Sequence, residues 1–179
     1  IHKDQQTTDA KTGKTKWVSP VSKQEYFRQL VQQCVYNNLL FKYVLADSWF
    51  SSAENFRFVA DLNRHFIMPL KANRKVALSQ SDHQQGRYQS RRGTAIESVS
   101  LEEGQTLVVW VEGVDFPLVL TRQVFKDGDR VQGQLYLVTN DLTADSVCIQ
   151  THYARRWKIE EFHKSLKSNA GYAHSPAHR

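Results

Sequence analysis

The chain has 179 residues, with 24 lysines and arginines against 18 aspartates and glutamates, a net charge of +6 and a pI near 9.4. Hydrophobic residues make up 40% of it, which excludes a disordered polyelectrolyte, since such a chain buries too little apolar surface to offset its conformational entropy. No apolar run approaches the roughly 20 residues that span a bilayer, which excludes a membrane protein. Two cysteines, Cys34 and Cys148, provide neither a disulfide framework nor a paired zinc motif.

The positive charge is concentrated at the two ends of the chain. Residues 1–75 carry 12 basic and 6 acidic side chains, residues 76–130 carry 6 and 8, and residues 131–179 carry 6 and 4. A polyanionic partner would therefore meet the ends of the chain rather than its middle. The charge alone does not separate a nucleic-acid-binding protein from an ordinary basic protein.

The first half of the chain alternates between helical and strand patterns. Residues 1–21 are polar, lack a hydrophobic period and are expected to form a tail or loop. Ser22 and Glu25 then form a capping box, which predicts a helix starting there. A strand over 41–46, a helix capped by Ser51 or Ser52, and a second strand over 66–70 follow. This order indicates an α/β layer with parallel strands.

The pattern changes after Lys71. Residues 73–93 are polar and are expected to form a linker. Short apolar runs separated by turn signals then predict four strands, over 95–101, 107–112, 116–125 and 134–139. The sequence therefore predicts an antiparallel β block inserted into an α/β chain. A long helix capped by Thr143 and running to about Lys167 should follow it.

One face of this last helix carries charged groups where a structural helix would carry apolar ones. At about 100° per residue, four side chains fall within roughly 60° of one another: Tyr153, Arg156, Glu160 and Lys167. A solvated surface helix with ion pairs is the commoner meaning of such charges. A functional interpretation needs a second carboxylate nearby, and Asp47 is suited to this because ligands gather beyond the carboxyl ends of strands in α/β sheets. Carboxylates from different elements, holding oxygen-preferring cations, are what phosphoryl transfer requires.

The spacing Tyr153-x2-Arg156-x3-Glu160-x6-Lys167 resembles the tyrosine–arginine–glutamate–lysine signature of bacterial insertion-sequence transposases of the DDE superfamily. The segment Val44-Leu45-Ala46-Asp47-Ser48-Trp49-Phe50 is similar to the one around that family's second aspartate. The resemblance covers the chain from about residue 20 onward. It implies an α/β, RNase H-like fold whose first strands are missing, with core parts at 22–75 and 140–179 and an inserted antiparallel β domain at 76–139.

The resemblance also implies an activity and its site. The chain would be the catalytic domain of a DNA transposase, an endonuclease and strand transferase acting at transposon ends in DNA transposition and recombination. Asp47 and Glu160 would match catalytic metal ligands, with two Mg²⁺ (or Mn²⁺) ions expected in the complete site. The DNA-binding residues would be Tyr153, Arg156 and Lys167 from the signature, together with Lys164, Lys71 and Arg74 from their positions.

The implied partner is double-stranded DNA, both transposon ends and target, with a dimer in the full-length synaptic complex. The implied location is the bacterial cytoplasm, on the nucleoid, with no membrane partner. The family's first aspartate has no match here, because Asp4 and Asp9 lie in polar stretches without a strand pattern. The chain is therefore expected to be a fragment that is inactive alone. The alternatives are a catalytically dead DNA-binding remnant, and an RNase H-like nuclease unrelated to transposition, against which the signature helix argues.

Overall fold

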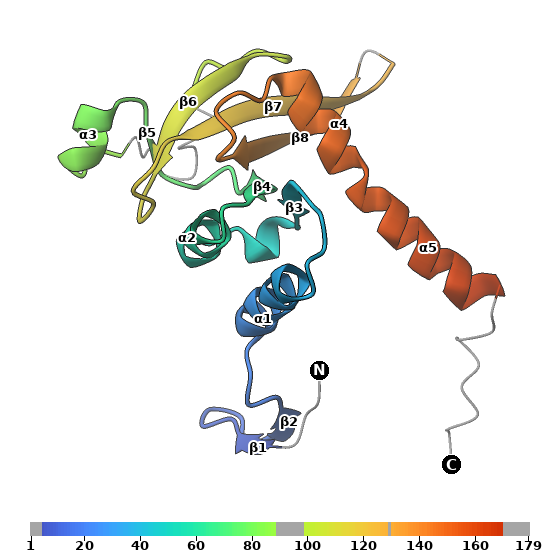
Figure 1. The fold of residues 1–179 in the computed structure, drawn as a ribbon. Helices are drawn as coiled ribbons and strands as arrows, with labels where there is room; N and C mark the ends of the chain where they lie inside the picture. The colour runs from blue at the N-terminus through green and yellow to red at the C-terminus, as the bar shows by residue number, and fades with distance from the viewer. Residues whose placement is uncertain (1–4, 89–98, 129, 170–179) are drawn as a thin grey trace. The chain divides into compact units, whose positions relative to one another are not determined.

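The computed structural model describes residues 5–88, 99–128 and 130–169. The chain forms two compact units, one reaching Leu40 and the other starting at Phe41 (Figure 1). None of the helices within the described ranges combines the length and the apolar character needed to cross a membrane.

The first unit begins with a β-hairpin where the sequence predicts a loop. Strands β1 (Gln5–Thr8) and β2 (Thr15–Val18) pair in antiparallel fashion. The turn is held by Asp9, whose Oδ1 accepts the amides of Lys11 and Thr12 at 2.9 and 3.0 Å. Nearly every residue of both strands is exposed, so the hairpin has no apolar face and no alternating pattern that could have revealed it.

Helix α1 (Lys23–Tyr36) completes the first unit and starts where the capping box predicts. The Oγ of Ser22 accepts the amide of Glu25 at 3.1 Å, which satisfies one of the amides left unpaired at a helix start. Val31 is the buried residue of this helix, whereas Cys34 is only half-buried.

The second unit is built on a six-stranded sheet in the order β3-β4-β8-β7-β6-β5. Its strands are β3 (Tyr43–Leu45), β4 (His65–Leu70), β5 (Val76–Ala77), β6 (Thr106–Val111), β7 (Leu118–Asp127) and β8 (Arg130–Thr139). Strands β3 and β4 are parallel, as the α/β pattern predicts. Strands β6, β7 and β8 pair in antiparallel fashion, which confirms three of the four strands predicted in the β block.

The β block continues the α/β sheet. Strand β8 pairs with β4 along Ile67–Leu70, so one ladder joins the parallel pair to the antiparallel strands. Most of the fourth predicted strand, over 95–101, lies outside the described residues, and its last residues are not in a strand. The expected linker instead contains β5 and the short helix α3 (Gln80–Gln84), which is capped by Ser79.

Two helices cover opposite faces of β4. Helix α2 (Ala53–Asp61), capped by Ser52 as predicted, places Phe56 in a stack on Phe66, with ring centroids 4.5 Å apart. The next residue of β4, Ile67, packs instead with residues of α4 (Ser146–Ala154). Because successive strand residues point to opposite faces, α2 lies on one side of β4 and α4 on the other.

A turn of the β block packs against the start of α2. Gly113, between β6 and β7, has φ +81°, and a Cβ there would lie 3.2 Å from the Cβ of Ala53. Both the backbone conformation and the contact therefore favour glycine. The contact brings the β block close to the segment that follows Asp47.

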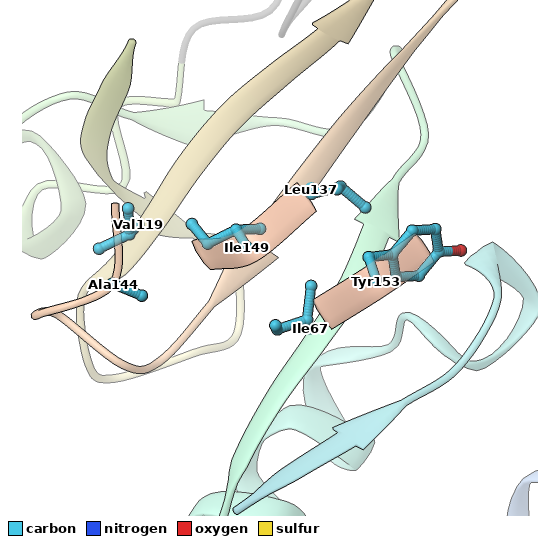
Figure 2. Packing of buried hydrophobic residues seen from close by; sticks show 6 residues of the cluster. All are labelled: Ile67, Val119, Leu137, Ala144, Ile149 and Tyr153. Atoms are coloured by element: carbon cyan, nitrogen blue, oxygen red, sulfur yellow. The ribbon is translucent and has the colours of Figure 1, made fainter. Parts of the chain in front are cut away.

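Helix α4 packs on the sheet through a cluster of buried hydrophobic residues (Figure 2). Its buried members are Ile67, Val119, Leu137, Ala144, Ile149 and Tyr153. Tyr43 and Leu45 of β3 pack against this cluster. The cluster fixes the end of α4 that carries Tyr153 over the sheet and beside β3.

The last helix differs from the prediction at its start. Helix α4 is capped by Asp145, whose Oδ1 accepts the amide of Cys148 at 2.7 Å. Thr143 is not its cap, because the Thr143 hydroxyl and amide both donate to Asp141 Oδ1, at 2.7 and 3.1 Å. The prediction that Thr143 caps this helix is therefore wrong.

The predicted single helix is also interrupted. It is divided at Arg155 into α4 and α5 (Arg156–Asn169). The amide of Arg155 donates to the carbonyl of His152, and the amide of Lys158 donates to that of Arg155, both three-residue steps. Such steps are tighter than those of an α-helix. Whether Tyr153 faces the same side as the residues of α5 therefore depends on the geometry of this junction as well as on helical periodicity.

We predict that Ile149→Ala destabilises the second unit by about 2–5 kcal/mol, since it removes a fully buried side chain and leaves a cavity between α4 and the sheet. Val147→Ala is the matched control on the same helix, because Val147 is 70% exposed and its loss should change stability by no more than about 0.5 kcal/mol. Urea unfolding of both variants measures the difference. Equal midpoints would contradict this packing.

Candidate active site

Asp47 lies just beyond the carboxyl end of β3. Its backbone is extended, with φ −82° and ψ 176°, and its Oδ1 accepts the amide of Trp49 at 2.8 Å, which starts the short turn η1 (Ser48–Phe50). Leu45, two residues earlier, packs against the cluster beneath α4. Because side chains alternate along extended backbone, Asp47 lies on the same side of the sheet as Leu45 and α4. Its side chain is exposed there.

Tyr153 is the buried residue of this site, at 4% exposure. Burial raises the pKa of its hydroxyl, and the neighbouring Arg156 guanidinium opposes this in part. The negative charges of Asp47 and Glu160 raise the pKa further. Both carboxylates therefore lie within electrostatic range of one phenol, although they come from elements separated by more than a hundred residues.

Arg156 connects the tyrosine to the glutamate. Its guanidinium carbon lies 5.4 Å from the ring centroid of Tyr153 and 5.0 Å from that of Trp157. Its Nη1 donates to Glu160 Oε1 at 2.5 Å, one turn further along α5. Burial lowers the pKa of Arg156, but Tyr153 and Glu160 outweigh this and leave it raised. Among the described residues, the buried Nε of Arg156 has no hydrogen-bond partner.

The structure thus brings together four of the predicted site residues: Asp47, Tyr153, Arg156 and Glu160. The two predicted lysines of α5, Lys164 and Lys167, are exposed further along that helix. At about 1.5 Å per residue, Lys167 lies about 10 Å beyond Glu160 along the helix axis. The lysines therefore extend the positive surface away from the carboxylates.

Lys71 and Arg74 lie at the same end of the sheet as Asp47. They occupy the turn after β4, where the amide of Arg74 donates to the carbonyl of Lys71 at 2.9 Å. Strands β3 and β4 are parallel, so their carboxyl ends share one edge of the sheet. Lys71 is exposed, whereas Arg74 is half-buried.

The two acidic residues of the site have side chains of the type that binds hard divalent cations. Carboxylate oxygens are the ligands that Mg²⁺ prefers, and Asp47 and Glu160 are both exposed. Within the described part of the chain, no three histidine, cysteine or acidic side chains form a group that could hold a metal. Asp9 uses its carboxylate in its own turn, and Asp4 lies outside the described residues.

A second acidic centre, at Asp141, was missed by the sequence analysis. Its side chain is only 6% exposed and receives Lys42 Nζ at 2.8 Å and the Tyr43 hydroxyl at 2.6 Å on Oδ2. Thr143 donates twice to Oδ1. Burial raises the pKa of Asp141, but the hydrogen bonds from Lys42, Tyr43 and Thr143 outweigh it and hold that pKa well below its usual range. Burial and the hydrogen bond to Asp141 raise the pKa of Tyr43 to about 12.

Asp141 does not complete the carboxylate pair of Asp47 and Glu160. It follows β8, which runs antiparallel to β4, so it lies at the edge of the sheet where β3 begins. Tyr43 precedes Asp47 by four residues, a distance of about 13 Å along an extended strand. The sequence signal was an aspartate two residues beyond the end of an apolar strand, much like the aspartate at position 47.

The family model described as "Transposase DDE domain" matches residues 5–179. No curated protein matches the chain significantly. The match covers both units, including the hairpin and α1.

We predict that Asp141→Asn destabilises the protein at neutral pH by about 2 kcal/mol, because buried donors lose a charged acceptor. The folded state lowers the pKa of Asp141, so its stabilisation is complete above the unfolded pKa of about 4 and is lost as the pH falls below it. The difference in the free energy of unfolding between the variant and the wild type, measured with urea, should therefore be smaller at about pH 3 than at pH 7. Asp115→Asn is the control, because Asp115 is exposed. A loss of stability in Asp141→Asn that is the same at both pH values would contradict the lowered pKa of Asp141.

Proposed function

The chain belongs to the family of transposase DDE domains, which are enzymes that act on DNA, and from this premise we propose that it supplies the catalytic domain of a DNA transposase. It cleaves phosphodiester bonds at transposon ends and transfers the freed strand ends to target DNA. The observation that carries the proposal is that Asp47 and Glu160 both lie within electrostatic range of the Tyr153 hydroxyl, while Arg156 lies over the Tyr153 ring and pairs with Glu160.

Asp47 and Glu160 are the proposed metal-binding catalytic residues. Asp47 is presented by the end of β3 and Glu160 by the second turn of α5. These two carboxylates would hold two divalent cations, Mg²⁺ or Mn²⁺, whose chemistry would be to activate a water or a 3′-hydroxyl and to stabilise the leaving oxygen. In the structure Glu160 is paired with Arg156, which balances its charge until the site is assembled.

Arg156 is the proposed phosphate-binding residue nearest the carboxylates. Two aromatic rings lie beside its guanidinium and hold it next to Glu160. Planar guanidinium groups bind phosphate through paired hydrogen bonds. The Tyr153 hydroxyl, which like any tyrosine is protonated at neutral pH, can donate to the same group.

The exposed lysines extend this surface for the DNA backbone. Lys164 and Lys167 continue along α5, while Lys71 and Arg74 lie at the sheet edge near Asp47. Such contacts bind phosphates without reading sequence and so hold a duplex in position. We assign the partner as double-stranded DNA, with a dimer in the synaptic complex, on the bacterial nucleoid in the cytoplasm.

The fold that we propose for the core is RNase H-like. The parallel pair β3–β4 carries Asp47 at the end of β3, and α4, on one face of this pair, leads into α5, which carries Glu160. The segment 76–139 is an insertion in sequence that extends the same sheet. In this arrangement the core parts are 22–75 and 140–179, and 1–21 precede them.

The competing function is a catalytically dead DNA-binding remnant. It is favoured by one observation, that no third acidic ligand joins Asp47 and Glu160 within the described residues. Both an active transposase and a dead remnant would bind DNA through the basic surface, but only the active transposase would cleave it. Metal-dependent cleavage by the full-length natural protein therefore separates them.

We predict that Asp47→Asn and Glu160→Gln each abolish metal-dependent nicking of a transposon-end duplex by the full-length protein, while its dissociation constant changes by no more than about threefold. Amide side chains keep the size of the carboxylates but bind cations poorly. Glu161→Gln is the matched control on the same turn and should retain cleavage. Retained nicking in either variant would refute the catalytic assignment.

We predict that Lys167→Ala weakens DNA binding and lowers the slope of log affinity against log salt by about 1, because one phosphate contact is lost. Affinity should fall by a similar factor for specific and unrelated duplexes. Lys126→Ala is the control, since its ammonium already pairs with Glu103 at 3.1 Å. Fluorescence anisotropy titrations at several salt concentrations measure both slopes, and equal slopes for wild type and Lys167→Ala would argue against the contact.

A further inference from the structure

Tyr43 contacts both the loop that joins β8 to α4 and the helix α4 itself. Its hydroxyl donates to Asp141 Oδ2 at 2.6 Å, and its ring centroid lies 4.9 Å from that of His152 with the planes tilted by 52°. The Sγ of Cys148 lies 3.9 Å from the same hydroxyl. One side chain of β3 therefore meets the loop before α4 and two positions on the helix itself.

Asp141 is in turn fixed to the loop between β8 and α4. Its amide donates to Thr139 Oγ1 at 3.1 Å, and its carbonyl accepts the amide of Ala144 at 3.2 Å. Thr143 holds the other carboxylate oxygen. The carboxylate that receives Tyr43 thus has little freedom to move.

Tyr43 and its partner His152 are both close in sequence to residues of the site. Asp47 comes four residues after Tyr43, and Tyr153 comes directly after His152. Tyr43 therefore joins β3 to α4 next to the two residues by which these elements enter the site. We propose that Tyr43 and Asp141 form a positioning pair that sets α4 against β3, and so holds Tyr153 and Arg156 in place beside Asp47.

The apolar cluster alone would not fix this placement as closely. Hydrophobic contacts among its members, which include Ile67 and Ile149, stabilise the packing but have no preferred direction. A hydrogen bond to a buried carboxylate is short and directional, so it fixes the loop that leads into α4 relative to β3, while the Tyr43 ring meets His152 on the helix itself. An error of about 1 Å in a catalytic arrangement costs about 100-fold in rate. The pair touches neither DNA nor the reacting atoms, and its role rests on the proposed function.

The test is Tyr43→Phe in the full-length protein, which removes the hydroxyl and keeps the ring against His152. Asp141 then retains Lys42 and Thr143, so the fold should persist. In single-turnover cleavage we expect the rate constant to fall about 10- to 100-fold, with the reacting fraction and the dissociation constant for DNA unchanged. Tyr88→Phe is the matched control, because its hydroxyl is bound instead to His83 Nδ1 at 3.1 Å.

Asp141→Asn should reproduce the loss, and the double variant should be no slower than the worse single variant, since the two residues act as one unit. A merely structural role would lower the reacting fraction and leave the rate constant of the remaining molecules unchanged. An unchanged rate constant in Tyr43→Phe, or a loss confined to the reacting fraction, would overturn the proposal.

A second measurement does not depend on cleavage. In the apo protein, nuclear Overhauser contacts between the Tyr153 ring and the Ile67 methyls report the placement of α4 on the sheet. We expect them to weaken or shift in Tyr43→Phe and to stay unchanged in Tyr88→Phe, and identical contacts in both would overturn the positioning role. If the wild type did not cleave DNA, the proposed function would fail while this comparison still decided the role of Tyr43.

Discussion

The burial of Ile149 and Tyr153 against the sheet is the interaction on which the rest of the candidate site depends. Helix α4 contributes these two side chains to a core shared with Ile67 of β4 and Leu137 of β8. Strand β8 can supply Leu137 only because it pairs directly with β4. The β block therefore helps to build the surface on which α4 rests, even though it interrupts the α/β part of the sequence.

A fixed α4 gives the site its charged groups in a defined order. Tyr153 is buried and anchored, Arg156 lies over its ring, and Glu160 pairs with Arg156 one turn later. Each group is thus positioned by the one before it, starting from the core. Since α5 has no buried residue among those described, its direction relative to the sheet is set by this short series of contacts at its start.

Parts of the fold and of the site that depend on local sequence patterns could be predicted from the sequence, whereas pairings between distant residues could not. The caps at Ser22 and Ser52 and the parallel strands around Asp47 follow from local patterns, because each depends on neighbouring residues. The hairpin at 5–18 has no apolar face to reveal it. The β4–β8 pairing and the contact of Tyr43 with Asp141, 98 residues apart, depend on the tertiary fold and have no local signal.

The break at Arg155 shows why helical periodicity was a useful but incomplete guide to the site. Counting about 100° per residue placed Tyr153 and Glu160 on one face of a single helix. The two residues do share the site, but they belong to different helices joined by a tighter turn. What keeps them together across that turn is Arg156, which stacks on the ring behind it and pairs with the carboxylate ahead of it. The arginine of the signature thus has a structural reason to stand between the tyrosine and the glutamate, in addition to any contact with phosphate.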